Sequence, residues 1–151
     1  MSRGRLDVIS SFRRSGNGVL FASDSAGEGI DLAGDILSSL IVVKLPFPVP
    51  DPVMEYQRNQ YEDFDSYRKA IIIPEMLIKL RQWFGRGIRR ENDTAVFSIL
   101  DNRASLHGRY RMEILNTLPA MPVTDRIMDV TNFIIRKKAD SYFVDKEREE
   151  K

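Results

Sequence analysis

Apolar residues recur at helical spacing in the segment that begins at Pro74. A helix over this segment gathers one apolar face, because 3.6 residues make a turn: Met76, Leu77, Leu80, Phe84 and Ile88. The opposite face carries polar and basic side chains: Lys79, Gln82, Arg86 and Arg89. Such a face suits an anionic ligand, since guanidinium groups bind phosphate oxygens in bidentate geometry. A solvated basic face on an ordinary amphipathic helix explains the same spacing.

Two glycines in this segment favour the binding interpretation. Gly85 and Gly87 each cost about 1 kcal/mol relative to alanine in a helix interior. Their presence predicts a close approach of backbone or ligand, or an early end of the helix. Trp83 is expected to pack in the core or to be half-buried, with base stacking as the alternative.

Short apolar runs predict three strands, at residues 19–22, 40–43 and 94–100. The first two runs are continuous, which is typical of strands buried on both faces. Helices are expected near residues 6–12, 52–64, 74–88, 108–118 and 125–143, the last capped by Thr124. This alternation predicts an α/β fold with a mostly parallel sheet and helices on both faces, as part of a larger unit. The cluster at residues 136–138 is interpreted as the basic end of the last helix.

Two connecting segments are unusual in composition. Residues 45–52 contain four prolines, which predicts a rigid connector, with a PxxP-type ligand as the alternative. The loop at residues 23–35 follows the first predicted strand, where open α/β sheets bind ligands. Its glycines allow close approach, and its four acids could accept ribose hydroxyls or pair with arginines. It is neither a Walker A loop nor a GxGxxG fingerprint, and an acidic surface loop is the simpler interpretation.

Composition excludes several classes of function. The 151 residues include no cysteine, so disulfides and zinc or iron–sulfur thiolate sites are excluded. A net charge of +1 argues against a uniformly basic nucleic-acid surface. No apolar run approaches 18 residues, and we expect a cytoplasmic protein without membrane contact. His107 has no nearby nucleophile in the sequence, which argues against a small-molecule enzyme.

Four blocks carry a family resemblance in order along the chain. They are residues 27–35 (GEGIDLAGD), 45–50 (LPFPVP), 82–89 (QWFGRGIR) and 99–103 (ILDNR), followed by Leu118-Pro119. Together they resemble the second, C-terminal motor domain of superfamily-2 ATP-dependent DNA helicases of the DinG/XPD-like group. The first block is similar to motif V of that family and the third to motif VI. The resemblance implies a partial RecA-like three-layer domain over residues 1–123, with 124–151 as a C-terminal helix and charged tail.

The resemblance also implies roles for individual residues. Arg89 or Arg86 would be the arginine finger on the γ-phosphate of ATP. The residues expected to face the nucleotide are Gln82, Gly85, Asp31, Glu28 and Gly29, and those expected near the DNA backbone are Ser23 and Ser25. Single-stranded DNA and the N-terminal motor domain of the same parent protein are the implied partners. Mg²⁺ would be held mainly by that first domain.

The sequence has neither a Walker A lysine loop nor an Asp-Glu-x-His box. Phosphate and magnesium therefore have no primary site in this chain, and we expect it to be inactive alone. The alternative is a stand-alone, non-catalytic nucleic-acid-binding or regulatory module derived from the same fold.

Overall fold

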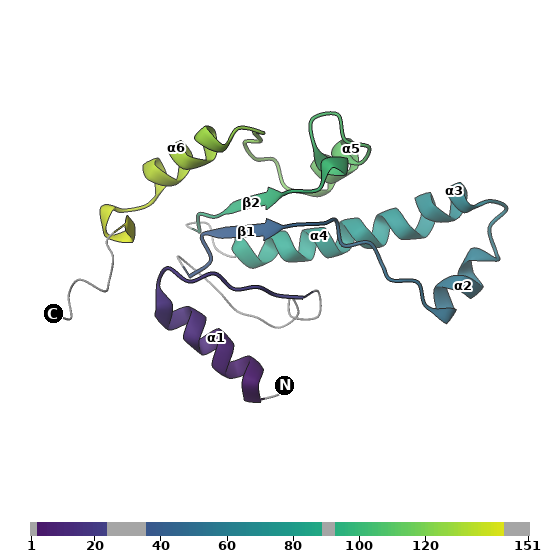
Figure 1. The fold of residues 1–151 in the computed structure, drawn as a ribbon. Helices are drawn as coiled ribbons and strands as arrows, with labels where there is room; N and C mark the ends of the chain where they lie inside the picture. The colour runs from purple at the N-terminus through teal and green to yellow at the C-terminus, as the bar shows by residue number, and fades with distance from the viewer. Residues whose placement is uncertain (1–2, 24–35, 89–92, 144–151) are drawn as a thin grey trace. The chain divides into compact units, whose positions relative to one another are not determined.

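A computed structural model describes residues 3–23, 36–88 and 93–143 (Figure 1). Its longer elements are α1 (Arg3–Ser15), β1 (Ser39–Val42), α2 (Pro52–Arg58), α3 (Phe64–Tyr67), α4 (Ile73–Gly87), β2 (Val96–Ile99), α5 (Arg111–Thr117) and α6 (Ile127–Lys137). A π-helical turn, η3 (Arg68–Ile72), joins α3 to α4. Two 3-10 turns follow β2 and α6: η4 (Asn102–Ala104) and η5 (Asp140–Phe143).

The two strands form a parallel pair. The Val96 amide donates to the Ser38 carbonyl at 2.9 Å, and the Leu100 amide donates to the Val42 carbonyl at the same distance. Both bonds join residues with the same sequence offset, which is the register of parallel strands. The predicted α/β class is therefore confirmed.

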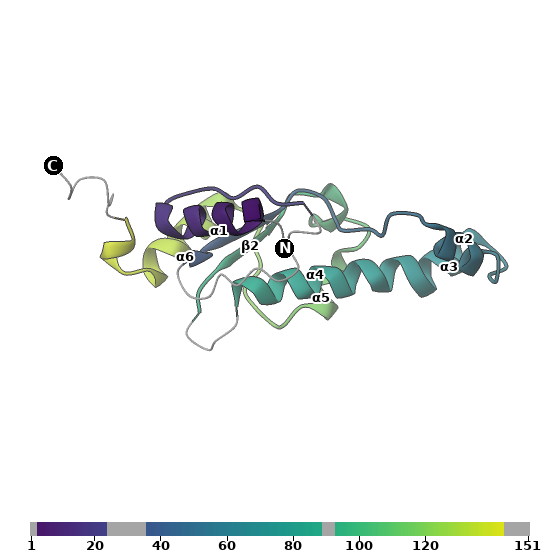
Figure 2. The same ribbon diagram turned by 90° about the horizontal axis from the view of Figure 1, so that it is seen from below.

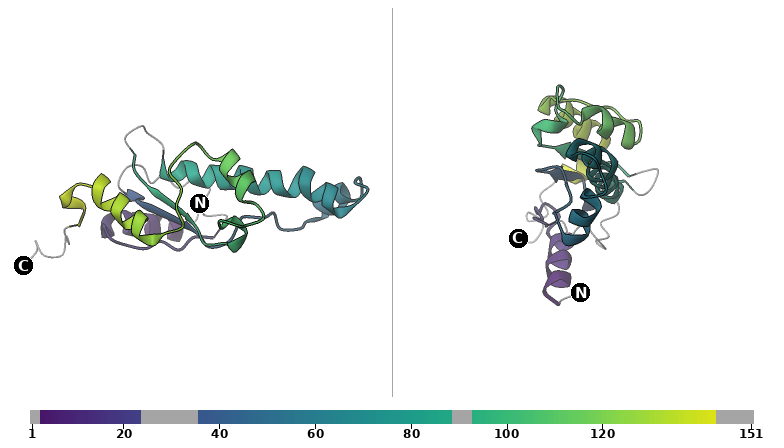
Figure 3. Two further views of the ribbon diagram at one scale, coloured as in Figure 1. Left: turned by 90° about the horizontal axis from the view of Figure 1, so that it is seen from above. Right: turned by 90° about the vertical axis from the view of Figure 1, so that its right-hand side faces the viewer.

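The chain divides into two compact units, each described here by itself. The unit of residues 41–85 and 97–123 has its core around α4, where Met76 and Leu80 have no exposed surface. The other buried members of this core are Val42, Leu45, Tyr110, Ile114 and Leu118. Helix α5 lies beside α4 (Figure 3), because Ile114 belongs to the same cluster.

Helix α4 continues an earlier helix and does not begin at Pro74. The helical path runs from Phe64 through η3 into α4 without a break (Figure 2). Asp63 caps its start by accepting the Ser66 amide at 2.8 Å. Proline has no N–H and its ring crowds the carbonyl four residues earlier, so the wider turn just before Pro74 accommodates it inside the helix. The predicted start at Pro74 is therefore wrong, whereas the predicted apolar face is confirmed as far as Phe84.

Two strand predictions need correction. Residues 19–22 form no strand, and Val19 and Phe21 are 80% and 93% exposed. The strand predicted at residues 40–43 exists as β1, but Val42 is buried while Ile41 and Val43 are exposed. An apolar run is buried on both faces only where other elements cover it. Within the described residues the sheet has two strands, so composition alone overstated the burial.

The helices also differ from prediction at their ends. Helix α2 ends at Arg58, where residues 52–64 were expected to be helical, and Asp51 caps it by accepting the Met54 amide at 2.8 Å. Helix α6 covers Ile127–Lys137. The Thr124 hydroxyl accepts the Arg126 amide at 3.1 Å, but the N-cap position of α6 is Arg126. Thr124 thus closes a turn that precedes the helix and does not cap it.

The unit of residues 1–40, 86–96 and 124–151 has a small apolar cluster. Ile9 on α1 and Leu37 are its buried members, and Phe12 and Leu40 pack against them. In the same unit the Lys138 ammonium donates to the Thr94 carbonyl at 2.8 Å, and Lys138 is 8% exposed. Arg136 and Lys137 lie in the last turn of α6, so the predicted basic helix end is confirmed for these two residues. Lys138 is the C-cap residue and is buried against the chain that leads into β2.

Candidate functional site

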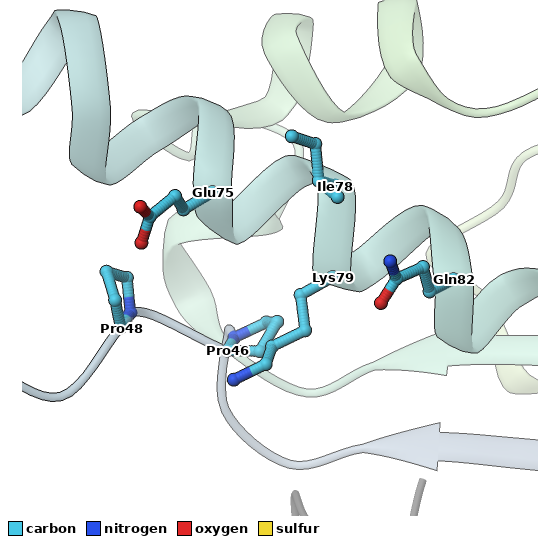
Figure 4. Close-up of a pocket in the computed structure, with 6 residues that line it drawn as sticks. All are labelled: Pro46, Pro48, Glu75, Ile78, Lys79 and Gln82. Carbon is cyan, nitrogen blue, oxygen red and sulfur yellow. The ribbon is translucent and has the colours of Figure 1, made fainter. Parts of the chain in front are cut away.

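One face of α4 and the proline-rich segment after β1 enclose a shallow pocket of about 200 Å³. Its lining residues are Pro46, Pro48, Glu75, Ile78, Lys79 and Gln82 (Figure 4). The polar side chains project from α4 and the two prolines lie across from them. The structure thus brings two of the family-like blocks together, the proline-rich block and the start of the motif VI block.

The proline-rich segment is held here by two apolar side chains that pack into the core around α4. Leu45 is 4% exposed and belongs to the core around α4, and Phe47 packs against that core. The Phe47 and Tyr110 rings are 5.4 Å apart in a tilted arrangement, a favourable geometry for aromatic pairs. Pro46 and Pro48 line the pocket, and Pro46 is itself buried. The segment therefore forms a wall of the pocket, and its rigidity remains a prediction.

Asp101, which follows β2, holds the beginning of that segment. One of its carboxylate oxygens accepts the Leu45 amide at 3.0 Å and Arg103 Nη2 at 2.7 Å. The other accepts Arg103 Nε at 2.9 Å and the Arg103 amide at 3.0 Å. These bonds, chiefly those from the Arg103 guanidinium, hold the pKa of Asp101 well below its ordinary value, and burial opposes them. The carboxylate is therefore charged, buried and fully engaged.

Arg103 is held in turn by its own neighbours. Its guanidinium carbon lies 4.6 Å from the centre of the Phe47 ring, a cation–π distance. Its carbonyl accepts the Tyr110 amide at 2.9 Å. A side chain at Gly108 would overlap that carbonyl, so only glycine permits this turn. We call Asp101, Arg103 and Phe47, with the Leu45 amide, the Asp101 clasp.

The sequence signalled the Asp101 clasp only weakly. Residues 99–103 carry part of the family resemblance, which implies no binding or catalytic role for them. An aspartate directly after a buried strand, with an arginine two residues on, is a pattern for a local side-chain turn. The bond from Asp101 to Leu45 joins residues 56 positions apart, and no local pattern predicts it.

The predicted nucleotide-facing residues are placed in part. Gln82 is exposed on α4, and Arg86 follows one helical turn later with a half-buried side chain. Gly85 has open space where a Cβ would stand, since nothing lies within 4 Å. Gly87 is the last residue of α4 and is buried, and a Cβ there would stand 3.3 Å from that of Ala95. For Gly87 the predicted helix end is confirmed, whereas the group that comes close is the Ala95 side chain and not the predicted backbone or ligand.

Several predicted residues lie outside the described part of the chain: Arg89, Ser25, Glu28, Gly29 and Asp31. Ser23 is described and is exposed. Trp83 is half-buried and packs against the core around α4, as predicted. Among the described residues no His, Cys, Asp and Glu cluster could hold a metal ion. No helix of that part is long and apolar enough to span a bilayer.

A parallel strand pair with α4 packed against it is an α/β arrangement, and the exposed Gln82 of α4 belongs to the block that resembles motif VI. The sequence profile described as the helicase C-terminal domain matches residues 2–121. The chain therefore belongs to the helicase C-terminal domain family, and the DinG/XPD-like resemblance is confirmed.

Individual relatives agree with this membership. The chain is 34% identical to the ATP-dependent DNA helicase YoaA of Escherichia coli over 139 residues, 88% of this chain and 21% of that protein. It is 38% identical to the ATP-dependent DNA helicase DinG of Photobacterium profundum over 103 residues, 67% of this chain and 15% of that protein. The chain is 29% identical to the 3′–5′ exonuclease DinG of Bacillus subtilis over 120 residues, 78% of this chain and 13% of that protein. The chain thus spans about a fifth or less of each relative.

Proposed function

We propose that this chain is the C-terminal motor half of an ATP-dependent DNA helicase. It works with a first motor domain that holds most of the nucleotide and its Mg²⁺. Turnover opens and closes the cleft between the two domains and moves single-stranded DNA along the protein. Residues 1–123 form the motor domain in this proposal, and residues 124–151 form an appended helix and tail. The chain alone is inactive, because its sequence lacks a Walker A loop and an Asp-Glu-x-His box.

The observation that carries this proposal is the exposed motif VI face of α4. Lys79 and Gln82 line an open pocket, and both side chains can donate hydrogen bonds. Gly85, on the same helix, has no neighbour within 4 Å of a Cβ position among the described residues, apart from the backbone of α4 itself. The other glycine of this segment is explained by a contact inside the chain. A close approach from outside, by nucleotide or by the first motor domain, supplies a reason for Gly85.

Residue roles follow from the family resemblance. Arg89 is the arginine finger in this proposal, with Arg86 as the other candidate. Arg86 follows Gln82 by about one turn on α4, and a guanidinium group there can neutralise charge on a transferring phosphoryl group. Arg89 takes its role from the motif VI resemblance alone. The residues that contact the nucleotide or couple it to DNA are Gly29, Glu28, Asp31, Gln82 and Gly85, and those near the DNA backbone are Ser23 and Ser25.

The test is substitution of Arg89 in the full-length helicase. We expect Arg89→Ala to reduce ATP turnover by on the order of 10³-fold or more, while most nucleotide binding survives. Arg81→Ala is the matched control, because Arg81 is an exposed arginine of α4 outside the motif. Turnover is measured as phosphate release with saturating single-stranded DNA. Unchanged turnover in Arg89→Ala would remove this residue from the finger role.

A stand-alone binding module makes the opposite prediction for the isolated chain. It would bind single-stranded DNA by itself, with an affinity that falls steeply as salt rises. The motor-half proposal predicts weak binding by the isolated chain, in line with a net charge of +1. Fluorescence anisotropy of a labelled oligonucleotide at two salt concentrations separates the two.

A further inference from the structure

The Asp101 clasp and the pocket share one segment of chain. Asp101 binds the amide of Leu45, and the next three residues supply Pro46, Phe47 and Pro48. The Arg103 guanidinium lies over the ring of Phe47, the residue that stands between the two prolines in the sequence. The clasp therefore fixes this segment at its first residue and at its middle residue. Of the two prolines that form the pocket wall, Pro46 lies between these two fixed residues and Pro48 follows the second.

We propose that Asp101 and Arg103 are positioning residues that set the proline wall against Lys79 and Gln82. Neither residue lines the pocket. They act through the backbone at Leu45 and the ring of Phe47. This inference rests on the proposed function, because it takes the Gln82 face as the surface that meets the nucleotide.

Geometry argues that the clasp does more than add stability. A buried aspartate could be satisfied by local amides alone, yet this one reaches the Leu45 amide 56 positions away. The Arg103 fork uses two nitrogens on the two carboxylate oxygens, which fixes orientation as well as distance. The stacked guanidinium then transmits that orientation to Phe47. Proline has a fixed φ angle, so a segment held at these points has little freedom left.

The first experiment measures the position of the wall directly in the isolated chain. The chain has no cysteine, so Val49→Cys with Arg81→Cys creates two unique labelling sites, both exposed. The distance between nitroxide labels is measured by electron paramagnetic resonance. We expect a single narrow distribution in the parent double-cysteine chain. We expect Asp101→Ala to broaden it, and Asp101→Asn, which keeps an oxygen for the Leu45 amide, to broaden it less.

Arg103→Lys separates charge from geometry in the same measurement. Lysine keeps the positive charge but cannot form the fork, so we expect broadening in this variant as well. Leu118→Ala is the control for stability, because Leu118 belongs to the core and does not line the pocket. A distribution that stays narrow in Asp101→Ala, or broadens equally in Leu118→Ala, overturns the inference.

The second experiment asks whether the wall matters to the nucleotide. In the full-length helicase, we expect Asp101→Asn and Arg103→Lys to raise the KM for ATP by on the order of tenfold or more. We expect kcat to change less, and Leu118→Ala to leave KM unchanged. If Gln82→Ala leaves KM unchanged, the proposed function fails at this face. If Gln82→Ala raises KM and the clasp variants do not, only the positioning inference fails.

Discussion

Among the residues that the structure describes, the two compact units differ sharply in how much apolar surface each buries. The core around α4 gathers seven buried residues, two of them with no exposed surface. The cluster beneath α1 has two buried residues, Ile9 and Leu37. The unit of α1 also leaves Val19 and Phe21 largely exposed. Helical and strand-like patterns occur in both units, so the pattern alone does not tell how well each is packed.

The difference indicates which unit carries its own stability. Burial of a large aliphatic side chain contributes about 1.5–3 kcal/mol, and such terms must offset the entropy of ordering the chain. The α4 unit meets this requirement with a continuous cluster from both strands' residues, α4 and α5. The described residues of the unit of α1 bury far less apolar surface to offset the same conformational entropy per residue. We therefore expect unfolding to begin in the unit of α1.

The largest expected loss of stability comes from a substitution in the better-packed unit. Leu80→Ala should lower the free energy of unfolding by about 3 kcal/mol, since Leu80 is completely buried and leaves a cavity. Ile9→Ala, the matched change in the smaller cluster, should cost roughly 1 kcal/mol because few neighbours surround it. Urea unfolding followed by the emission of Trp83, the single tryptophan, reports the α4 core. Equal losses in the two variants would contradict the contrast between the units.

A smaller loss of stability is expected when the hydrogen bond between Lys138 and Thr94 is removed from the unit of α1. Lys138 is buried and its ammonium group donates to the Thr94 carbonyl, so Lys138→Met should cost about 1–2 kcal/mol. Lys137 is exposed and its neighbour in sequence, so Lys137→Met should change stability by less than about 0.5 kcal/mol. Hydrogen exchange at the amides near Thr94 measures both. Equal exchange in the two variants would show that this bond does not anchor the segment.

The sequence was informative where a local rule applied and uninformative where burial depended on distant partners. The apolar stripe of α4 was predictable because helical spacing alone places Met76 and Leu80 together. The exposure of Phe21 was not, since an apolar run does not reveal whether another strand covers it. The same spacing predicted the polar face with Gln82, and the family blocks added its role toward a nucleotide, which stays a prediction. The contact of Asp101 with Leu45 depends on the fold of the whole unit, so it was found only in the structure.

The smallest expected effect is that of Gly85→Ala, which should raise stability and lower activity. Gly85→Ala should stabilise the domain by up to about 1 kcal/mol, because alanine favours the helix and a Cβ meets nothing within 4 Å. Gly87→Ala is the matched control and should not stabilise, since its Cβ would crowd Ala95 at 3.3 Å. Thermal unfolding of the isolated chain measures this difference.

If the proposed function holds, the same Gly85→Ala change should weaken ATP turnover in the full-length protein. The added methyl group would occupy space that the proposed function reserves for the nucleotide or the first motor domain. A variant that is more stable and less active would show that Gly85 is retained for an approach from outside the chain. A variant that is more stable and fully active would mean that nothing comes close to α4 at this position. Contact with a ligand through α4 would then have to involve Gln82 or Arg86 without a close approach at Gly85.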